Sequence, residues 1–241
     1  MEQSHGGLVS VTTGQQRSKK MKSPEKKSAA YDAKCRSCAR LADHLDEVRS
    51  GHPQYFCAPV PSFGADRPEL LIVGLAPGLH GANRTGRPFT GDHAGILLYA
   101  TLHKFGYASH AGSAEPTDGL RLLNCRVTNA VKCLPPGNKP LPAEIRRCNA
   151  YLAEEIVMCR PKAILALGRI AHDAVLMALG LRPASHAFAH ARRHELESHG
   201  RPVALFDSFH CSRYNTQTRR LTTPMFESVV LAAKSHLDAG R

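Results

Sequence analysis

The sequence contains no run of about 18 apolar residues, the length that a membrane-spanning helix needs, and no apolar secretion signal opens it. These absences argue against a membrane protein and lead us to expect a cytoplasmic one. Acidic residues are scarce as well: 20 Asp and Glu stand against 32 Lys and Arg, a formal net charge of +12. This excess favours a polyanionic partner, most simply nucleic acid. No internal repeat is visible.

The length of 241 residues allows one large domain or two small ones. Residues 1–30 are rich in Ser, Gly, Gln and Lys and have few large apolar side chains, so they cannot bury enough surface to fold. We therefore predict a disordered basic tail over 1–30 and one domain over 31–241. The lysines of the tail either contact phosphates weakly or are simply solvated.

Eight cysteines in a cytoplasmic protein are more often thiols or metal ligands than disulfides. Cys35 and Cys38 form a C-x-x-C pair before a polar, helix-like stretch at 39–49, which favours a metal over a redox pair. Cys133 follows a predicted strand, and Cys148 lies inside a predicted helix. Four thiolates suit either zinc or an iron–sulfur cluster.

Short apolar runs alternate with helix-like segments, which predicts an α/β three-layer sandwich with a central four-stranded parallel sheet and helices on both faces. The predicted strands are Leu70–Val73, Leu122–Val131, Ala163–Leu167 and Val203–Phe206. The predicted helices are Ala94–Phe105, Pro142–Cys159, Arg169–Leu179 and Pro224–Leu237. Two polar stretches, 107–119 and 182–200, are interpreted as surface insertions.

The loop at 74–92 leaves the first strand and is rich in glycine and charge. Gly74 and Gly78 permit close backbone approach to a ligand such as a phosphate, although an ordinary strand–loop–helix connection has a similar composition. The carboxyl ends of parallel strands open on one edge of a sheet. We therefore expect this loop, Asn129 and His210 to converge.

Residues at this edge suit recognition of a nucleobase swung out of a duplex. Phe89 offers a flat face for stacking, unless it is a core side chain. The amide of Asn129 offers an acceptor and a donor that match N3–H and O4 of uracil, unless it only caps the strand end.

Cleavage of an N-glycosidic bond builds positive charge on the sugar and negative charge on the leaving base. Asp92, the only acid of the loop, could stabilise that cation or orient water, or it could serve only as a helix cap. His210 could stabilise the departing base by a hydrogen bond, although a lone histidine is more often structural.

The loop after the last strand has the composition of a phosphate-binding segment, and a solvated basic loop is the alternative. Its candidate residues are Ser212, Arg213, Thr216, Thr218, Arg219 and Arg220.

Three motifs together resemble the uracil-DNA glycosylase superfamily, specifically its family 5 (type B) branch. The first consists of Gly74-Leu-Ala-Pro-Gly78 and Gly86-Arg-Pro-Phe-Thr-Gly-Asp92, and the second runs from Asn129 to Pro140. The third begins at His210 and continues through Thr222. The resemblance covers roughly residues 31–237.

The resemblance implies a role for each matching residue. Asp92, His210 and Asn129 would be catalytic. The base would contact Gly74, Ala76, Gly78, Phe89, Asn129 and His210. DNA would contact Arg84, Arg87, Ser212, Arg213, Asn215, Thr216, Arg219 and Arg220. A structural 4Fe–4S cluster would be held by Cys35, Cys38, Cys133 and Cys148. The remaining four, Cys57, Cys125, Cys159 and Cys211, would be ordinary thiols.

We therefore expect a monomeric, monofunctional DNA repair glycosylase acting on uracil, and also on hypoxanthine or xanthine, in double-stranded DNA. It would use water, because the motifs offer no lysine in the cleft except Lys132, which we assign to a strand end. Family 4 shares the cysteine pattern but normally carries an acid at position 75, which is Leu75 here. Two competing hypotheses are a non-catalytic DNA-binding module with a four-cysteine metal site, and zinc in place of the cluster.

Overall fold

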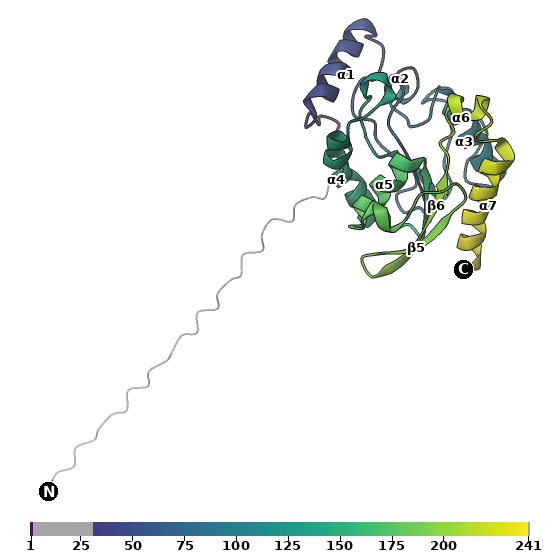
Figure 1. Cartoon of the computed structure of the whole chain (residues 1–241). Coiled ribbons are helices and arrows are strands. Elements are labelled where there is room, and N and C mark those ends of the chain that lie inside the picture. Colours follow the sequence, from purple (N-terminus) through teal and green to yellow (C-terminus); the bar gives the residue numbers. More distant parts are fainter. Residues whose placement is uncertain (2–30, 241) are drawn as a thin grey trace.

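The computed structural model describes Met1 and residues 31–240 (Figure 1). Apart from Met1, the tail predicted over 1–30 lies outside the described residues. Within them, no helix is long and apolar enough to cross a membrane. The cytoplasmic location stays a prediction.

A single mixed sheet of six strands runs through the described part of the chain, in the order β1-β3-β2-β4-β6-β5. Strands β3, β2, β4 and β6 pair in parallel, and β1 and β5 pair antiparallel at the two edges. The strands are β1 Phe63–Gly64, β2 Leu70–Gly74, β3 Cys125–Asn129, β4 Ala163–Leu167, β5 Arg193–Ser198 and β6 Arg201–Ser208.

The α/β class is confirmed, but the prediction of four strands was wrong because it omitted both edges. Strand β1 has only two residues, too few to produce a pattern. Strand β5 lies inside the stretch 182–200 that was interpreted as an insertion. Its side chains alternate between exposed and buried, as expected for an edge strand with one solvated face, and its charged residues obscured the apolar positions.

Helices cover both faces of the sheet. Helices α3 and α7 lie on one side of β6, and α4 and α5 lie on the other (Figure 1). Each face has its own core: Leu70 and Ile72 of β2 point into the first, and Leu71 and Val73 into the second. This alternation along a strand that is buried on both faces explains its uninterrupted apolar sequence.

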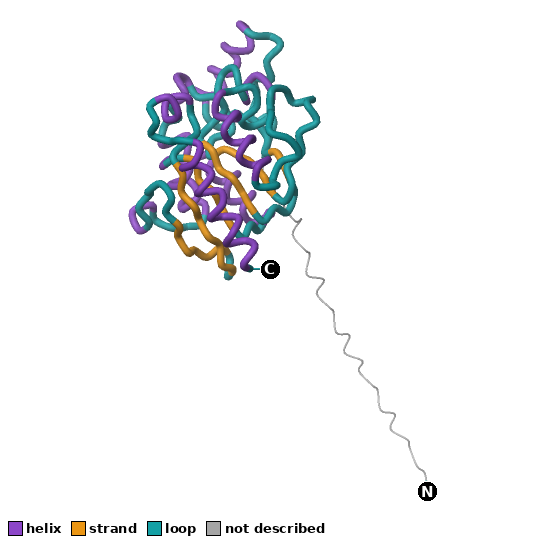
Figure 2. The backbone as a smooth tube through the Cα atoms, turned by 90° about the vertical axis from the view of Figure 1, so that its right-hand side faces the viewer, coloured by secondary structure: helices purple, strands orange, loops and turns teal. Residues whose placement is uncertain are grey.

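The described helices include five that agree with segments expected from the sequence and two short ones, at 82–85 and 213–217, that were expected to be loops. They are α1 Ala39–Gly51, α2 Ala82–Thr85, α3 His93–Lys104, α4 Pro142–Cys159, α5 Arg169–Ala178, α6 Arg213–Gln217 and α7 Thr223–Ala239, with short 3₁₀ turns at Pro136–Asn138 and Pro183–Ser185. Strands gather in the lower part of the molecule and loops crowd the part above them (Figure 2). The loops that follow β2, β3 and β6 carry the candidate site.

Candidate active site and cysteine site

A cavity of about 400 Å³ lies where the loops after β2, β3 and β6 meet. The three sequence motifs, far apart in the chain, therefore converge as expected. The lining residues are Leu75, Ala76, Gly78, Ala82, Phe89, Asp92, His93, Ala94, Asn129, Asn138, His210, Ser212 and Arg213.

Phe89 and Asn129 meet above Gly74, the last residue of β2. A side chain on Gly74 would place its Cβ 2.5 Å from both Asn129 Oδ1 and Phe89 Cζ, so only glycine leaves room for them. Asn129 is 4% exposed, and its Oδ1 is buried with no hydrogen-bond partner among the described residues. A buried acceptor left unpaired costs free energy, and a ligand N–H in the cavity would satisfy it. Gly74 therefore leaves room for the Phe89 and Asn129 side chains that line the cavity. It was predicted to contact the base, but it is not itself among the lining residues.

Asp92 is the N-cap of α3, and its Oδ1 accepts a hydrogen bond from the Gly95 amide at 2.8 Å. The same side chain lines the cavity, so capping and a chemical role are compatible. Glycines flank it on two sides: a Cβ on Gly81 would lie 2.5 Å from Asp92 Oδ2, and one on Gly95 would lie 1.9 Å from the Phe89 carbonyl oxygen. Burial raises the pKa of Asp92 above its ordinary value, although the helix amides oppose the shift.

His210 follows β6 and stacks on Phe89, with ring centroids 5.9 Å apart and an interplanar angle of 29°. Burial lowers the pKa of His210 to about 4, because the cation would lose its hydration. Near neutral pH the ring is therefore uncharged, with one N–H donor and one acceptor nitrogen. Its backbone is held by Asn215, whose Nδ2 donates to the His210 carbonyl at 2.7 Å.

A basic surface adjoins the cavity along α6 and the turn after it. Ser212 caps α6, and the exposed Arg213 lines the cavity. Arg219 and Arg220 are also exposed, and the Arg220 guanidinium lies 4.7 Å from the centre of the Phe209 ring. These side chains can reach a phosphate backbone beside the cavity.

The structure contradicts the expectation that Arg87 contacts DNA. Arg87 is 6% exposed, and its guanidinium pairs with Asp118 at 2.6 Å and reaches the Glu115 carbonyl at 2.7 Å. These contacts hold the loop 74–92 against the segment 107–119, and no pattern in the sequence indicates this pairing. Arg84 pairs with Glu115 at 2.8 Å but keeps part of its surface exposed.

Thr216 is also engaged within the protein. Its hydroxyl lies 2.9 Å from His93 Nε2 and donates to the Ser212 carbonyl at 3.2 Å, which joins α6 to the start of α3. A contact between this hydroxyl and DNA would have to replace those bonds.

Sequence reasoning missed three polar or aromatic residues at or beside the site. His93 and Asn138 both line the cavity. Tyr214 is 69% exposed on α6, between basic residues, where a flat ring can stack on a base. An aromatic residue inside a basic loop was the available signal for Tyr214. For His93 and Asn138 the sequence offers only their positions within the motifs.

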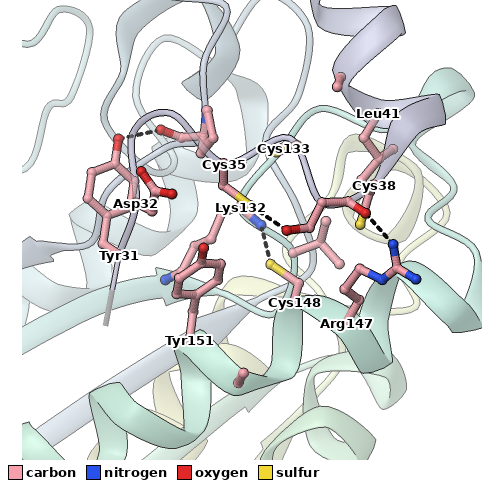
Figure 3. Close-up of a pocket in the computed structure, with 15 residues that line it drawn as sticks. Tyr31, Asp32, Cys35, Cys38, Leu41, Lys132, Cys133, Arg147, Cys148 and Tyr151 are labelled. Atoms are coloured by element: carbon pink, nitrogen blue, oxygen red, sulfur yellow. Dashed lines mark hydrogen bonds between the residues drawn. The ribbon is translucent and has the colours of Figure 1, made fainter. Parts of the chain in front are cut away.

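The four candidate metal-binding cysteines line one cavity of about 280 Å³ between the start of α1, the loop after β3 and α4. Cys35, Cys38 and Cys148 point toward the same space (Figure 3). The Lys132 amide donates to the Cys148 sulfur at 3.3 Å. Burial, followed by the charges of the neighbouring thiols, raises the pKa of Cys133 to about 12. A bound cation would be needed to hold four thiolates here.

The donor set bears on which metal group fits this cavity. Four cysteine thiolates lining one cavity suit either a single zinc ion or an iron–sulfur cluster.

The fold and the site together define an α/β protein with a pocket of about 400 Å³ at the carboxyl edge of its sheet. A model of the uracil DNA glycosylase superfamily matches residues 61–234, and the chain belongs to this superfamily. Curated relatives from two of its branches match the chain. The type-5 uracil-DNA glycosylase of Thermus thermophilus is 45% identical over 207 residues, covering 83% of this chain and 92% of the relative.

Two further relatives separate the branches. The type-5 uracil-DNA glycosylase of Pyrobaculum aerophilum is 37% identical over 210 residues, covering 86% of this chain and 89% of the relative. The type-4 uracil-DNA glycosylase of Archaeoglobus fulgidus is 31% identical over 152 residues, covering 63% of this chain and 69% of the relative. The expected likeness to the type-5 branch is confirmed, and the type-4 likeness is weaker and shorter.

Proposed function

We propose that this protein is a DNA repair enzyme, a monofunctional uracil-DNA glycosylase that acts as a monomer. It flips a deaminated base out of double-stranded DNA and hydrolyses the N-glycosidic bond to leave an abasic site. The observation that carries the proposal is one cavity that holds a carboxylate, an unpaired buried amide oxygen and a neutral imidazole. The proposed substrates are uracil and also hypoxanthine and xanthine.

Recognition of the flipped base falls to Phe89 and Asn129. The base stacks on Phe89, and Asn129 Oδ1 accepts the N3–H of uracil, which pairs the orphaned acceptor. Exposed residues of the basic surface, namely Arg213, Arg219 and Arg220, grip the phosphates on either side.

Hydrolysis falls to Asp92 and His210. As the bond to the base lengthens, the Asp92 carboxylate stabilises the cationic sugar and orients water toward its C1′ carbon. The bonding electrons leave with the base, and the neutral His210 donates a hydrogen bond to the base oxygen that gains charge. Water loses its proton to the Asp92 carboxylate as the new C–O bond forms.

A lysine Schiff base has no support in this geometry. Lys132 is 2% exposed, and its Nζ donates to Glu155 at 3.0 Å, away from the lining of the cavity. The reaction therefore ends at the abasic site without breaking the strand.

Loss of the Asp92 charge is the test of this proposal. In Asp92→Asn, whose amide can still cap α3, we expect cleavage of a uracil-containing duplex to fall about 10²- to 10⁴-fold while duplex binding changes little. Cleavage is read as strand breaks after alkali treatment in single turnover, and binding as a Kd. Asp66→Asn, at a fully exposed side chain, is the matched control.

Two outcomes would contradict the proposal. Equal losses of cleavage and binding in Asp92→Asn would remove the chemical role of Asp92. A wild-type protein that binds uracil duplexes without producing alkali-sensitive sites would favour the non-catalytic DNA-binding module. Duplexes containing hypoxanthine or xanthine, assayed beside uracil, measure how broad the pocket is.

We assign a structural 4Fe–4S cluster to Cys35, Cys38, Cys133 and Cys148. The glycosylase reaction takes place in the other cavity, which contains Asp92 and His210. A cluster held by the four cysteines would tie the segment before α1 to the loop after β3 and to α4. We expect purified protein to contain about four irons and four acid-labile sulfides per chain, both lost in Cys148→Ala. One zinc per chain, without iron, would support the zinc hypothesis instead.

A further inference from the structure

A second group of ionisable side chains lies outside the cavity, on the α5 face of the sheet. His172 of α5 and Asp207 of β6 have no exposed surface, and His194 of β5 is 8% exposed. His172 Nδ1 lies 2.7 Å from Asp207 Oδ1, and His194 Nε2 lies 3.0 Å from Asp207 Oδ2. We refer to these three residues as the His–Asp–His network.

Hydrogen bonds on both sides of the His172 ring determine where its protons are. Nε2 lies 2.7 Å from the His186 carbonyl oxygen, which can only accept, so Nε2 carries a hydrogen. Nδ1 faces the Asp207 carboxylate, so it carries one too. The imidazolium form of His172 can donate to both oxygens at once, which favours the cation. Burial alone would disfavour that cation, but the hydrogen bond and the charge of Asp207 raise the pKa of His172 above its ordinary value.

These three side chains also have the composition of a metal site, and their ligand atoms lie within 4.8 Å of one another. Zinc bonds of about 2.0 Å at tetrahedral angles would hold ligand atoms about 3.3 Å apart. The 2.7 Å between His172 Nδ1 and Asp207 Oδ1 is instead the length of a charge-assisted hydrogen bond. The geometry favours a closed hydrogen-bonded network.

The network holds the segment 186–192 against the end of β6. His172 fixes the His186 carbonyl, and the Ala189 amide donates to Asp207 Oδ2 at 3.4 Å. The backbone joins the same elements: the Ala191 amide donates to the Asp207 carbonyl at 2.9 Å, and the Asp207 amide donates to the Arg192 carbonyl at 2.9 Å.

The same segment reaches the residue that precedes His210. The Phe209 amide donates to His190 Nδ1 at 3.2 Å, and the two rings stack at 4.9 Å with an interplanar angle of 9°. A continuous set of contacts thus runs from the His–Asp–His network through 186–192 to the backbone that presents the His210 ring to the cavity.

We propose that the His–Asp–His network positions His210 for catalysis, with Asp207 and His172 as positioning residues that never touch the substrate. This inference rests on the proposed function of His210. It gives the segment 186–192 a specific task, which is to fix the backbone from Asp207 to His210. A buried ion pair seldom stabilises a fold better than apolar packing does. A positioning role explains why this pair includes Asp207, which precedes His210 by three residues in the sequence.

A double-mutant cycle tests the inference. In Asp207→Asn, single-turnover cleavage of a uracil duplex should fall about 10- to 100-fold, because small misplacements of a catalytic group are costly. The Kd for the duplex should stay within about threefold. In the His210→Ala background the same substitution should change cleavage less than about twofold, since the ring it positions is gone.

Glu155→Gln is the matched control. Glu155 is 1% exposed and forms a buried ion pair with Lys132, so the substitution also removes a buried carboxylate from a charged network. Its effect on cleavage should be the same with and without His210, because Glu155 accepts hydrogen bonds from β3 and Lys132 rather than from the segment that holds that ring.

A triple variant separates a loss of positioning from a loss of folding stability. His172→Leu, His194→Leu and Asp207→Val together replace the network by apolar side chains, and the melting temperature should match or exceed that of the wild type. Cleavage should nevertheless fall as in Asp207→Asn. A stable triple variant that cleaves at the wild-type rate would overturn the inference, because the network would then serve only the fold.

The remaining outcomes separate this inference from the proposed function. If His210→Ala is slow and Asp207→Asn slows both backgrounds equally, the positioning role fails and the role of His210 stands. If His210→Ala cleaves at the wild-type rate, both fail. One divalent metal per chain that is lost in Asp207→Asn would also overturn the inference, in favour of a metal site.

Discussion

Two histidines near the end of β6 are both withdrawn from water, yet their pKa values are shifted in opposite directions. His172 has no exposed surface and a pKa raised above its ordinary value, whereas His210 is less enclosed and has a pKa lowered to about 4. The difference lies in their neighbours. His172 faces the Asp207 carboxylate and a carbonyl oxygen, and His210 faces the Phe89 ring and the cavity.

The comparison shows that a partner, more than burial, determines the charge of a histidine in this fold. Burial penalises the cation at both positions, and only His172 has an anion that offsets the penalty. A neutral His210 can donate a hydrogen bond to a departing base, and it places no positive charge in the pocket before the bond to the base breaks. A charged His172 can bind two oxygens at once, which suits a structural tie.

Removal of the His210 ring should have the largest effect of the experiments that follow from this comparison. In His210→Gln we expect cleavage of a uracil duplex to fall about 10²- to 10³-fold, the usual loss when one donor to a developing negative charge is removed. Single-turnover rates measure it, with Kd as the second readout. His199→Asn, at an exposed histidine, is the control. Unchanged cleavage would show that a neutral imidazole is not needed here.

Acid should destabilise the protein through His210. The pKa of His210 is about 4 in the folded chain and about 6.5 in the unfolded chain. Between these two pH values the unfolded chain therefore binds a proton that the folded chain does not bind. The stability from a neutral His210 is complete above about pH 6.5 and is lost as the pH falls toward 4, by at most about 3 kcal/mol. Urea unfolding of wild type and His210→Gln at several pH values gives the difference curve. A flat difference would contradict the neutral assignment.

Alkali should weaken the protein through His172, with a smaller effect of the order of 1 kcal/mol. The folded pKa of His172 is raised, so its stabilisation is present below about pH 6.5 and is lost as the pH rises through the folded pKa. This slope is opposite in sign to that of His210. Urea unfolding above neutral pH should show it in the wild type but not in Asp207→Asn. Persistence of the slope in the variant would mean that Asp207 does not hold the proton on His172.

Much of the fold could be predicted because local patterns specify it. Strand β4 and helix α4 have the predicted bounds, since an apolar run and a proline-initiated helix leave clear signals in the sequence. The convergence of Asp92, Asn129 and His210 followed from parallel strand ends opening on one edge. The cavity at that edge contains all three side chains.

Pairings between distant segments could not be predicted in this way. The resemblance implied that Arg87 contacts DNA, but Asp118 pairs with it inside the protein. Asp207 and His172 are 35 residues apart, and neither belongs to a motif that would pair them. Ion pairs across loops depend on tertiary packing that has no periodic signature in one sequence.

The two glycines that flank Asp92 restrict how this pocket can diverge or be redesigned. Any side chain at Gly81 would displace the acid, and any at Gly95 would collide with the Phe89 backbone. Divergence toward a larger or smaller substrate must therefore use other positions that line the cavity, such as Ala76, Ala82 and Asn138. A mutational library intended to widen base preference has the best prospects at those three positions.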